Sequence, residues 1–279
     1  MNSQEKTILT EMARKIRIDI VEMLCSSGSG HPGGSLSMAD IFSYLYFSEK
    51  FKLGRQYLTS PERDRVVLSK GHACPVLYAA LAEKGYFDRS SLATLRKYGS
   101  MLQGHPDMKK TPGVEITTGS LGQGLSCAVG MALGAKLDSL RCRIFAIVGD
   151  GECDEGQIWE AAMSAAHYKL DNLTAILDKN GLQIDGFTKD VMNTEPMTDK
   201  WVSFGWEVVE IGGHDFDEID SAVSYSLSVK EKPVCIIAST LKGKGVSYME
   251  DQCEWHGKAP SEEEKQKAVS ELTGVKRSI

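Results

Sequence analysis

Two side chains that could bind a metal ion follow apolar, strand-like runs of the sequence. Asp150 comes shortly after the run at residues 143–148, and Asn180 follows the run at 173–177. A carboxylate at the end of a buried strand is costly unless it is paired or bound to a metal ion. If the two strands are neighbours, Asp150, Asn180 and the main-chain carbonyl of Leu182 form a set of hard oxygen ligands suited to Mg²⁺ or Ca²⁺.

The same segment could bind a diphosphate. Mg²⁺ usually completes its coordination shell with phosphate oxygens and water, so the metal site predicts a phosphorylated ligand. Gly151 and Gly156 let the backbone approach that ligand, and a helix expected to begin near Asp154 would point its N–H groups at it. The alternative interpretation is an ordinary strand–turn–helix in which the aspartate only caps the helix. The presence of a second polar residue, Asn180, at the end of the next strand argues against this alternative.

Histidines supply a second kind of chemistry. Four of the six histidines lie beside glycines in predicted loops, where a ligand rather than the core would surround them: His31, His72, His105 and His256. Histidine can both donate and accept a proton near pH 7, which suits proton transfer. His167 and His214 lie outside such loops, and we expect structural or surface roles for them.

The elements that must position these residues follow a repeating pattern. Near-continuous runs of Val, Ile and Leu alternate with helical periods, and nearly every run ends in glycine and a polar residue. The expected strands are 65–69, 143–148, 173–177, 206–211 and 234–238, and the expected helices are 4–25, 37–48, 75–84, 122–137, 156–168 and 215–229. This pattern predicts an α/β fold with a doubly wound, mostly parallel sheet, helices on both faces, and one domain over residues 1–279. Ligands of such sheets bind beyond the carboxyl ends of the strands.

Composition excludes several classes of function. The 279 residues carry a net charge of −6 with scattered basic residues, which argues against nucleic acid or an anionic membrane as a partner. The segment 28–33 matches the spacing of a dinucleotide-binding loop, but it follows a helix and contains Pro32, so we reject that interpretation. Seven cysteines without a Cys-x-x-Cys pair, and the lack of a signal peptide or long apolar run, predict a soluble cytoplasmic protein with no membrane span.

At this point the sequence resembles a known family. Asp150 between two glycines, followed thirty residues later by Asn180, resembles the signature of thiamine diphosphate enzymes. Further segments match transketolases in order: Ser29-Gly-His-Pro-Gly33, Leu68-Ser-Lys-Gly-His72, Gly104-His-Pro106, Thr117-Thr-Gly-Ser-Leu-Gly-Gln-Gly124, Asp178-Lys-Asn180, Ile184-Asp-Gly186 and Trp255-His256-Gly257. The resemblance covers about residues 10–260. It implies the thiamine diphosphate-binding fold, and within it the diphosphate-binding domain.

The resemblance also implies roles for individual residues. Asp150, Asn180 and the Leu182 carbonyl would bind Mg²⁺, or Ca²⁺ or Mn²⁺ in its place. The histidines divide between the cofactor diphosphate (His72, His256), the sugar donor (His31, His105) and proton transfer (His31 with His256). Further contacts with thiamine diphosphate are implied for Gly119, Ser120, Leu121, Gly151, Glu155, Asn180 and Lys242.

Some of these positions have a second interpretation. Ser120 replaces the proline that the family usually has. Lys242 is a better candidate than Lys70 for a contact with the diphosphate or substrate, but either could be an ordinary exposed lysine. Glu155 and Glu160 match acidic residues that link two cofactor sites across the family's dimer interface, yet both could simply complement a helix dipole.

The resemblance stops at the first of three transketolase domains, which leaves out the pyrimidine-binding and C-terminal domains. It therefore implies the N-terminal subunit of a split transketolase of the pentose phosphate pathway. This subunit would transfer a two-carbon ketol unit from a ketose phosphate to an aldose phosphate. It would act only with a C-terminal partner subunit, as an α2β2 heterotetramer.

Three alternatives stay open. The chain could belong to another thiamine diphosphate enzyme, either as a 2-oxo acid dehydrogenase α-type subunit or as a relative of deoxyxylulose phosphate synthase. The four histidines and the Trp255-His256-Gly257 segment favour transketolase over both. It could also be a non-catalytic, cofactor-binding regulatory subunit, although the intact metal set counts against a degenerate site.

Overall fold

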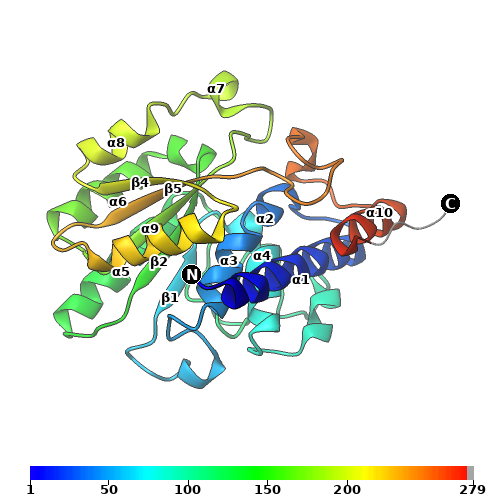
Figure 1. The fold of residues 1–279 in the computed structure, drawn as a ribbon, viewed down its shortest axis with the longest axis horizontal. Helices are drawn as coiled ribbons and strands as arrows, with labels where there is room; N and C mark the ends of the chain where they lie inside the picture. The colour runs from blue at the N-terminus through cyan, green and yellow to red at the C-terminus, as the bar shows by residue number, and fades with distance from the viewer. Residues whose placement is uncertain (275–279) are drawn as a thin grey trace.

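The computed structural model describes residues 1–274 and contains a five-stranded sheet (Figure 1). The strands are β1 (Arg65–Leu68), β2 (Ile144–Gly149), β3 (Leu173–Lys179), β4 (Glu207–Gly212) and β5 (Val234–Ser239). Their order is β1-β2-β3-β5-β4, and every neighbouring pair is parallel. Each of the five predicted runs forms a strand, so the α/β prediction is confirmed.

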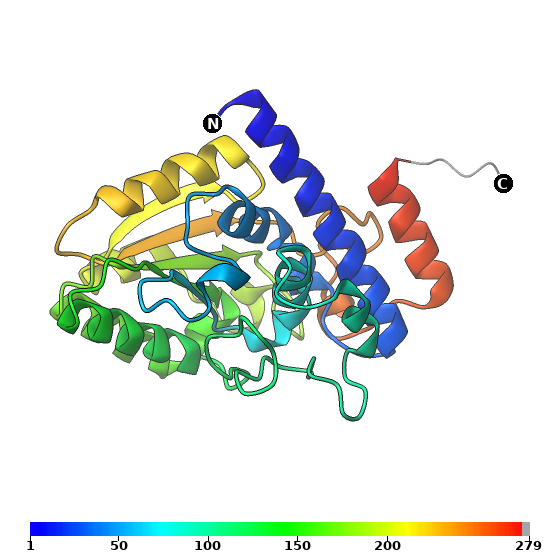
Figure 2. The ribbon, with the colours of Figure 1, turned by 90° about the horizontal axis from the view of Figure 1, so that it is seen from below.

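Helices cover both faces of this sheet (Figure 2). The core on the first face contains residues of α1 (Ser3–Ser27), α3 (Ala39–Phe47), α4 (Cys74–Glu83) and α9 (Phe216–Ser228), and α1 packs against α3 and α4. The second face packs against α5 (Gln123–Leu137), α6 (Gly156–His167) and α8 (Met197–Ser203). The other elements are α2 (Gly33–Leu36), α7 (Thr188–Val191), α10 (Glu262–Thr273), and the 3₁₀ turns η1 (Arg55–Tyr57), η2 (Gly71–Ala73), η3 (Arg89–Thr94), η4 (Gly151–Asp154) and η5 (Cys253–His256).

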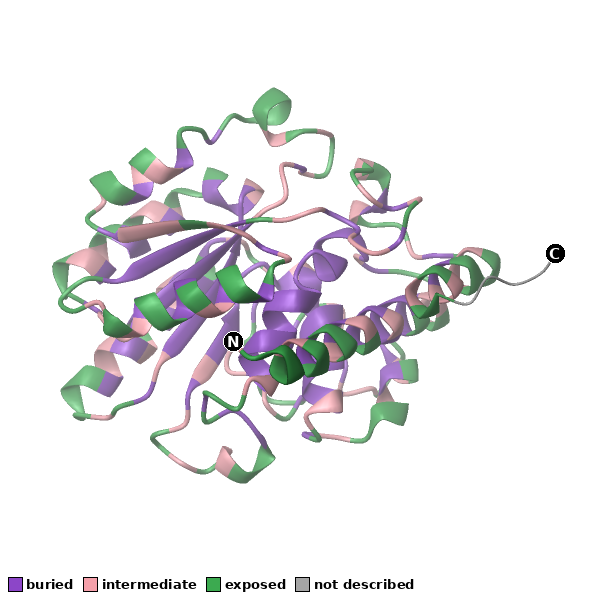
Figure 3. Ribbon diagram, viewed as in Figure 1, coloured by how far each residue is buried: buried purple, intermediate pink, exposed green. Residues whose placement is uncertain are grey.

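The central strands are buried on both sides, which explains their near-continuous apolar runs. Along β2, Phe145 and Ile147 belong to the core of the first face, whereas Ile144, Ala146 and Val148 belong to the core of the second. Figure 3 shows these strands as buried and the outer sides of the surrounding helices as exposed. The two cores therefore hold the strand ends, and the loops that follow them, in a fixed arrangement.

The N-terminal helix α1 is longer than the predicted span of 4–25. Asn2 and Glu5 form a capping box at its start, and Gly28 ends it in the left-handed conformation with φ 65°. Helix α10 lies alongside α1 (Figure 1). Among residues 1–274, no helix has the length and apolar character needed to cross a membrane. The single domain over residues 1–279 stays a prediction, and residues 275–279 lie outside the described part.

Candidate functional site

A cleft of about 240 Å³ opens where β1, β2, β3 and β5 end. This is the edge at which ligands of open parallel sheets bind. The cleft is lined by His31, Gly34, Lys70, His72, Gly119, Leu121, Gly149, Asp150, Gly151, Glu152, Asn180, Leu182, Gln183, Ile184, Lys242 and His256. Ten of the thirteen site residues predicted from the sequence are in this set.

The other three predicted residues, His105, Ser120 and Glu155, are exposed and do not line the cleft. His105 nevertheless lies at its rim, because a Cβ added to Gly119 would come within 3.1 Å of the His105 ring. The turn η4 occupies residues 151–154, and α6 begins at Gly156, which is the start of the expected helix 156–168 and two residues after Asp154. Glu155 therefore lies at the N-cap of α6, and its cofactor contact stays a prediction.

The predicted metal ligands come from the ends of two paired strands. Strands β2 and β3 are neighbours, and the buried carboxylate of Asp150 accepts the N–H groups of Gly151 at 2.8 Å and Gly181 at 2.6 Å. The Asn180 side-chain oxygen accepts the Leu182 N–H at 3.2 Å. Burial and the nearby Asp178 raise the pKa of Asp150 to about 6, although the two N–H hydrogen bonds and the charge of Lys70 act to lower it.

The donor set fits a hard cation. Within residues 1–274, no three His, Cys, Asp or Glu side chains are grouped to hold a metal ion. Asp150 is the carboxylate of the predicted set, so the amide oxygen of Asn180, the Leu182 carbonyl and a diphosphate would have to supply the remaining ligands. That composition suits Mg²⁺, which typically binds one or two carboxylates together with phosphate oxygens.

Glu152 is a functional candidate that the sequence patterns do not indicate. Its side chain is 3% exposed and accepts three hydrogen bonds: from the Ser69 hydroxyl at 2.5 Å, the Gly122 N–H at 2.8 Å and the Gly149 N–H at 3.0 Å. Burial nevertheless raises the pKa of Glu152. The residue connects the loops after β1 and β2 to the start of α5, and so supports the floor of the cleft.

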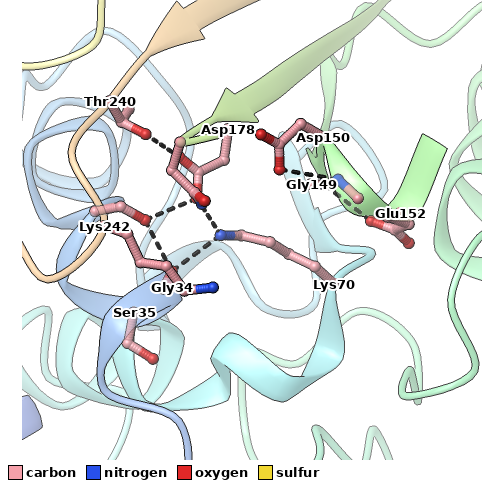
Figure 4. A network of polar contacts seen from close by, with 12 residues as sticks. Gly34, Ser35, Lys70, Gly149, Asp150, Glu152, Asp178, Thr240 and Lys242 are labelled. Carbon is pink, nitrogen blue, oxygen red and sulfur yellow. Dashed lines mark hydrogen bonds and ion pairs between the residues drawn. The ribbon is translucent and has the colours of Figure 1, made fainter. Parts of the chain in front are cut away.

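Lys70 and Asp178 form a buried ion pair (Figure 4). The sequence-based predictions do not include this pair. Asp178 is fully buried and accepts hydrogen bonds from four side chains, those of Ser37, Lys70, Asn180 and Thr240. Burial opposes ionisation of Asp178, but Lys70 and the hydroxyl donors outweigh it and lower the pKa of the carboxyl. Lys70 also donates to the Gly34 carbonyl at 2.9 Å, so the exposed-lysine alternative is wrong for Lys70.

Lys242 is equally buried, and among residues 1–274 its side chain has no direct contact with a carboxylate. Its Nζ lies 3.0 Å from the Leu182 carbonyl, 3.4 Å from the Gln183 carbonyl and 3.0 Å from Nδ1 of His256. Burial and the charge of Lys70 lower the pKa of Lys242 to about 8. The exposed-lysine alternative is therefore wrong here as well. The ammonium faces the cleft with carbonyl and imidazole partners, which leaves its charge available to an anionic ligand.

Three of the four loop histidines gather at the cleft. The ring centroids of His31, His72 and His256 lie 5.1–5.4 Å from one another. Burial, followed by nearby cations, lowers the pKa of His31 to about 4 and that of His256 to about 3, and holds the pKa of His72 well below its usual range. All three are therefore neutral at pH 7.

The remaining histidines have the structural and surface roles expected of them. His214 contacts Asp40 through Nδ1 at 2.7 Å and accepts the Leu241 N–H through Nε2 at 2.9 Å. His167 is exposed at the end of α6. His214 thus helps to hold the segment that carries Lys242.

Comparison with known proteins identifies the family to which the chain is similar. A profile of the family described as transketolase, thiamine diphosphate binding domain, matches residues 8–277. The chain is 48% identical to the 6-deoxy-6-sulfo-D-fructose transketolase subunit SqwG of Clostridium sp., over 97% of this chain and 98% of that protein. It is 42% identical to an apulose-4-phosphate transketolase subunit of Phocaeicola vulgatus, over 94% of this chain and 92% of that protein.

A solved structure extends the similarity to the fold. The transketolase from Campylobacter jejuni matches with a TM-score of 0.90 and 36% identity, over 98% of this chain and 43% of that one. The chain thus spans about two fifths of that transketolase, but nearly the full length of the two subunits named above.

Proposed function

The chain belongs to the transketolase family, and from that premise we propose that it is the N-terminal subunit of a thiamine diphosphate-dependent transketolase. It would transfer a two-carbon ketol unit from a ketose phosphate to an aldose phosphate. The observation that carries the proposal is the cleft at the strand ends, where Asp150, Asn180 and Leu182 lie in one cavity with three histidines. The comparisons do not favour the two other thiamine diphosphate enzymes.

We propose that Mg²⁺ binds the side chains of Asp150 and Asn180 and the carbonyl of Leu182. Ca²⁺ or Mn²⁺ would accept the same oxygens. Lys242 would provide the counter-charge for the cofactor diphosphate, since its Nζ has only carbonyl and imidazole contacts in the described structure. Lys70 is less suited to that role because its charge is already paired with Asp178. The glycine at position 34 leaves room for the ligand in front of Lys70 and His72.

When bound, thiamine diphosphate supplies the electron sink for breaking and making a carbon–carbon bond beside a carbonyl. The protein supplies positioning and proton transfer. An ammonium has only donors, so His256 accepts from Lys242 through Nδ1 and carries its own proton on Nε2. Nδ1 of His31 is buried without a hydrogen-bond partner among the described residues. These neutral rings can therefore donate to and accept from the hydroxyl and carbonyl groups of a sugar, with His105 at the rim.

The second half of the active site is proposed to come from another chain. Three relatives that this chain matches over nearly their full length are named as transketolase subunits. We propose a C-terminal partner with the pyrimidine-binding domain and an α2β2 assembly, in which Glu155 and Glu160 lie near the interface. A non-catalytic regulatory subunit is the competing proposal. A cytoplasmic location stays a prediction from the sequence.

The substrate is proposed as a ketose with a negatively charged group. Two relatives are named for 6-deoxy-6-sulfo-D-fructose and apulose 4-phosphate. A specialised sugar is therefore a candidate beside the ordinary pentose phosphates that the sequence analysis expected. A donor panel containing all of these compounds distinguishes the two proposals.

The test is reconstitution. The chain is mixed with the candidate partner encoded beside its gene, and two-carbon transfer is measured with thiamine diphosphate and Mg²⁺ over the donor panel. We expect transfer by the mixture and none by either chain alone. Transfer by this chain alone would refute the two-chain proposal. A mixture that binds the cofactor but transfers from no ketose would refute ketol transfer and favour the regulatory role.

A further inference from the structure

Asp178 has no ligand role in the proposed site, yet it is the most heavily bonded carboxylate beside it. Its Oδ2 accepts the Ser37 hydroxyl at 2.7 Å, the Asn180 amide at 2.9 Å and the Lys70 ammonium, and its Oδ1 accepts the Thr240 hydroxyl. Figure 4 shows it at the end of β3, between Lys70 and Thr240. Because Asp178 has no exposed surface, water cannot replace its carboxylate as the acceptor for these donors.

The bond to Asn180 has a consequence for the metal site. A side-chain amide has an oxygen on one side and an NH₂ group on the other, and the two can exchange places by a rotation at small steric cost. An ionised carboxylate can only accept hydrogen bonds, so Asp178 selects the NH₂ side. The oxygen of Asn180 then faces the other way, where it accepts the Leu182 N–H at 3.2 Å.

We propose that Asp178 is a positioning residue for the metal ion, because it fixes the amide of Asn180 with its oxygen, rather than its NH₂ group, turned toward the cation. This inference rests on the proposed metal site. Hydrogen-bonding partners of metal ligands typically change metal affinity or activity by about 10–100-fold when removed. Asp178 has this relation to Asn180, and it lies two residues before Asn180, at the end of β3.

A purely structural role is the competing explanation. Asp178 neutralises Lys70 and connects the segments after β1, β3 and β5, so its loss would also disturb packing. The two explanations differ in what a second substitution at position 180 would do. A carboxylate at 180 presents an oxygen in either orientation, whereas it does not restore the partner that Lys70 loses at position 178.

The experiment measures Mn²⁺ binding by electron paramagnetic resonance, in the presence of thiamine diphosphate, on the complex of this chain with its partner subunit. The comparison is made in a Lys70→Met background, because the Lys70 ammonium would otherwise hold the oxygen of a new amide in the place of Oδ2. There Asp178→Asn lets the new amide donate to the oxygen of Asn180 and turn the NH₂ group to the metal, so we expect about 10–100-fold weaker Mn²⁺ binding than in Lys70→Met alone. The matched control is Thr240→Val, which removes another donor from Asp178 but leaves its bond to Asn180. We expect that control to stay within about threefold of Lys70→Met alone.

The double variant Asp178→Asn with Asn180→Asp is the decisive comparison. In the same Lys70→Met background, the amide introduced at position 178 can donate to the carboxylate at 180, so we expect Mn²⁺ affinity to return to within about fivefold of Lys70→Met alone. The Lys70→Met substitution also removes the cation that Asp178→Asn would leave unpaired. Unchanged affinity in the folded single variant, or no recovery in the double variant, overturns the inference. A wild-type complex that binds no Mn²⁺ with the cofactor instead overturns the metal site, and this inference with it.

Discussion

Replacing Glu152 by glutamine tests whether a buried carboxylate supports the floor of the cleft. Glutamine has nearly the same shape, but one of its two acceptor oxygens becomes an NH₂ group. If the oxygen keeps the Ser69 and Gly122 bonds, the NH₂ group faces the Gly149 N–H, and both donors are left unsatisfied. Each buried donor without an acceptor costs about 1–3 kcal/mol, partly offset because no charge is buried, so we expect a net loss of about 2–4 kcal/mol.

The assay is urea denaturation followed by circular dichroism, with Glu155→Gln as the matched control. Glu155 is three residues away and exposed, so the same chemical change there is expected to alter the free energy of unfolding by less than about 0.5 kcal/mol. A Glu152→Gln variant that is as stable as Glu155→Gln would refute the reasoning. It would mean that water or a rearranged loop satisfies both of these donors.

Three further predictions follow from the geometry of the cleft. In the complex with the partner subunit, Asp150→Asn weakens Mg²⁺-dependent binding of thiamine diphosphate by at least about tenfold in a fluorescence titration, whereas Asp154→Asn at the end of η4 does not. Gly243→Ala lowers the melting temperature, because φ is +81° and the new Cβ would lie 2.3 Å from a main-chain oxygen, whereas Gly156→Ala is neutral. The contribution of His31 and His256 to urea stability falls between about pH 6.5 and 4. His31 and His256 have folded pKa values of about 4 and 3, below the usual 6.5, so over this interval the unfolded chain binds protons that the folded chain does not. Replacing both by glutamine makes this fall shallower, while His167→Gln leaves it unchanged.

Much of the fold can be predicted from local sequence patterns. The apolar run at 143–148 predicts β2 because a strand covered on both faces needs apolar residues at successive positions. The position of β5 between β3 and β4 has no such local signal, since it depends on which crossover packs best against the whole sheet. Helix α6 begins at Gly156, as the expected span 156–168 predicts, but the separate turn η4 has no local signal because its acidic, glycine-flanked sequence is also that of a helix N-terminus.

The candidate site is predictable where a residue type is itself diagnostic. Asp150 stands out in the sequence because a carboxylate at a buried strand end needs a partner. Asp178 at the end of β3 needs partners for the same reason, but they come from distant segments such as Ser37 and Thr240. Only the assembled sheet brings those donors together. Glu152 has no local signal for a similar reason, since its acceptor role depends on loops that follow β1 and precede α5.

The cleft is proposed to be the diphosphate half of an active site that two chains share. Isothermal titration of thiamine diphosphate with Mg²⁺ tests this directly, first on this chain alone and then on its complex with the partner subunit. We predict weak or undetectable binding by the chain alone and at least about tenfold tighter binding by the complex, because the partner would contribute the contacts with the pyrimidine ring. Full affinity in the chain alone, unchanged by the partner, would contradict the shared site.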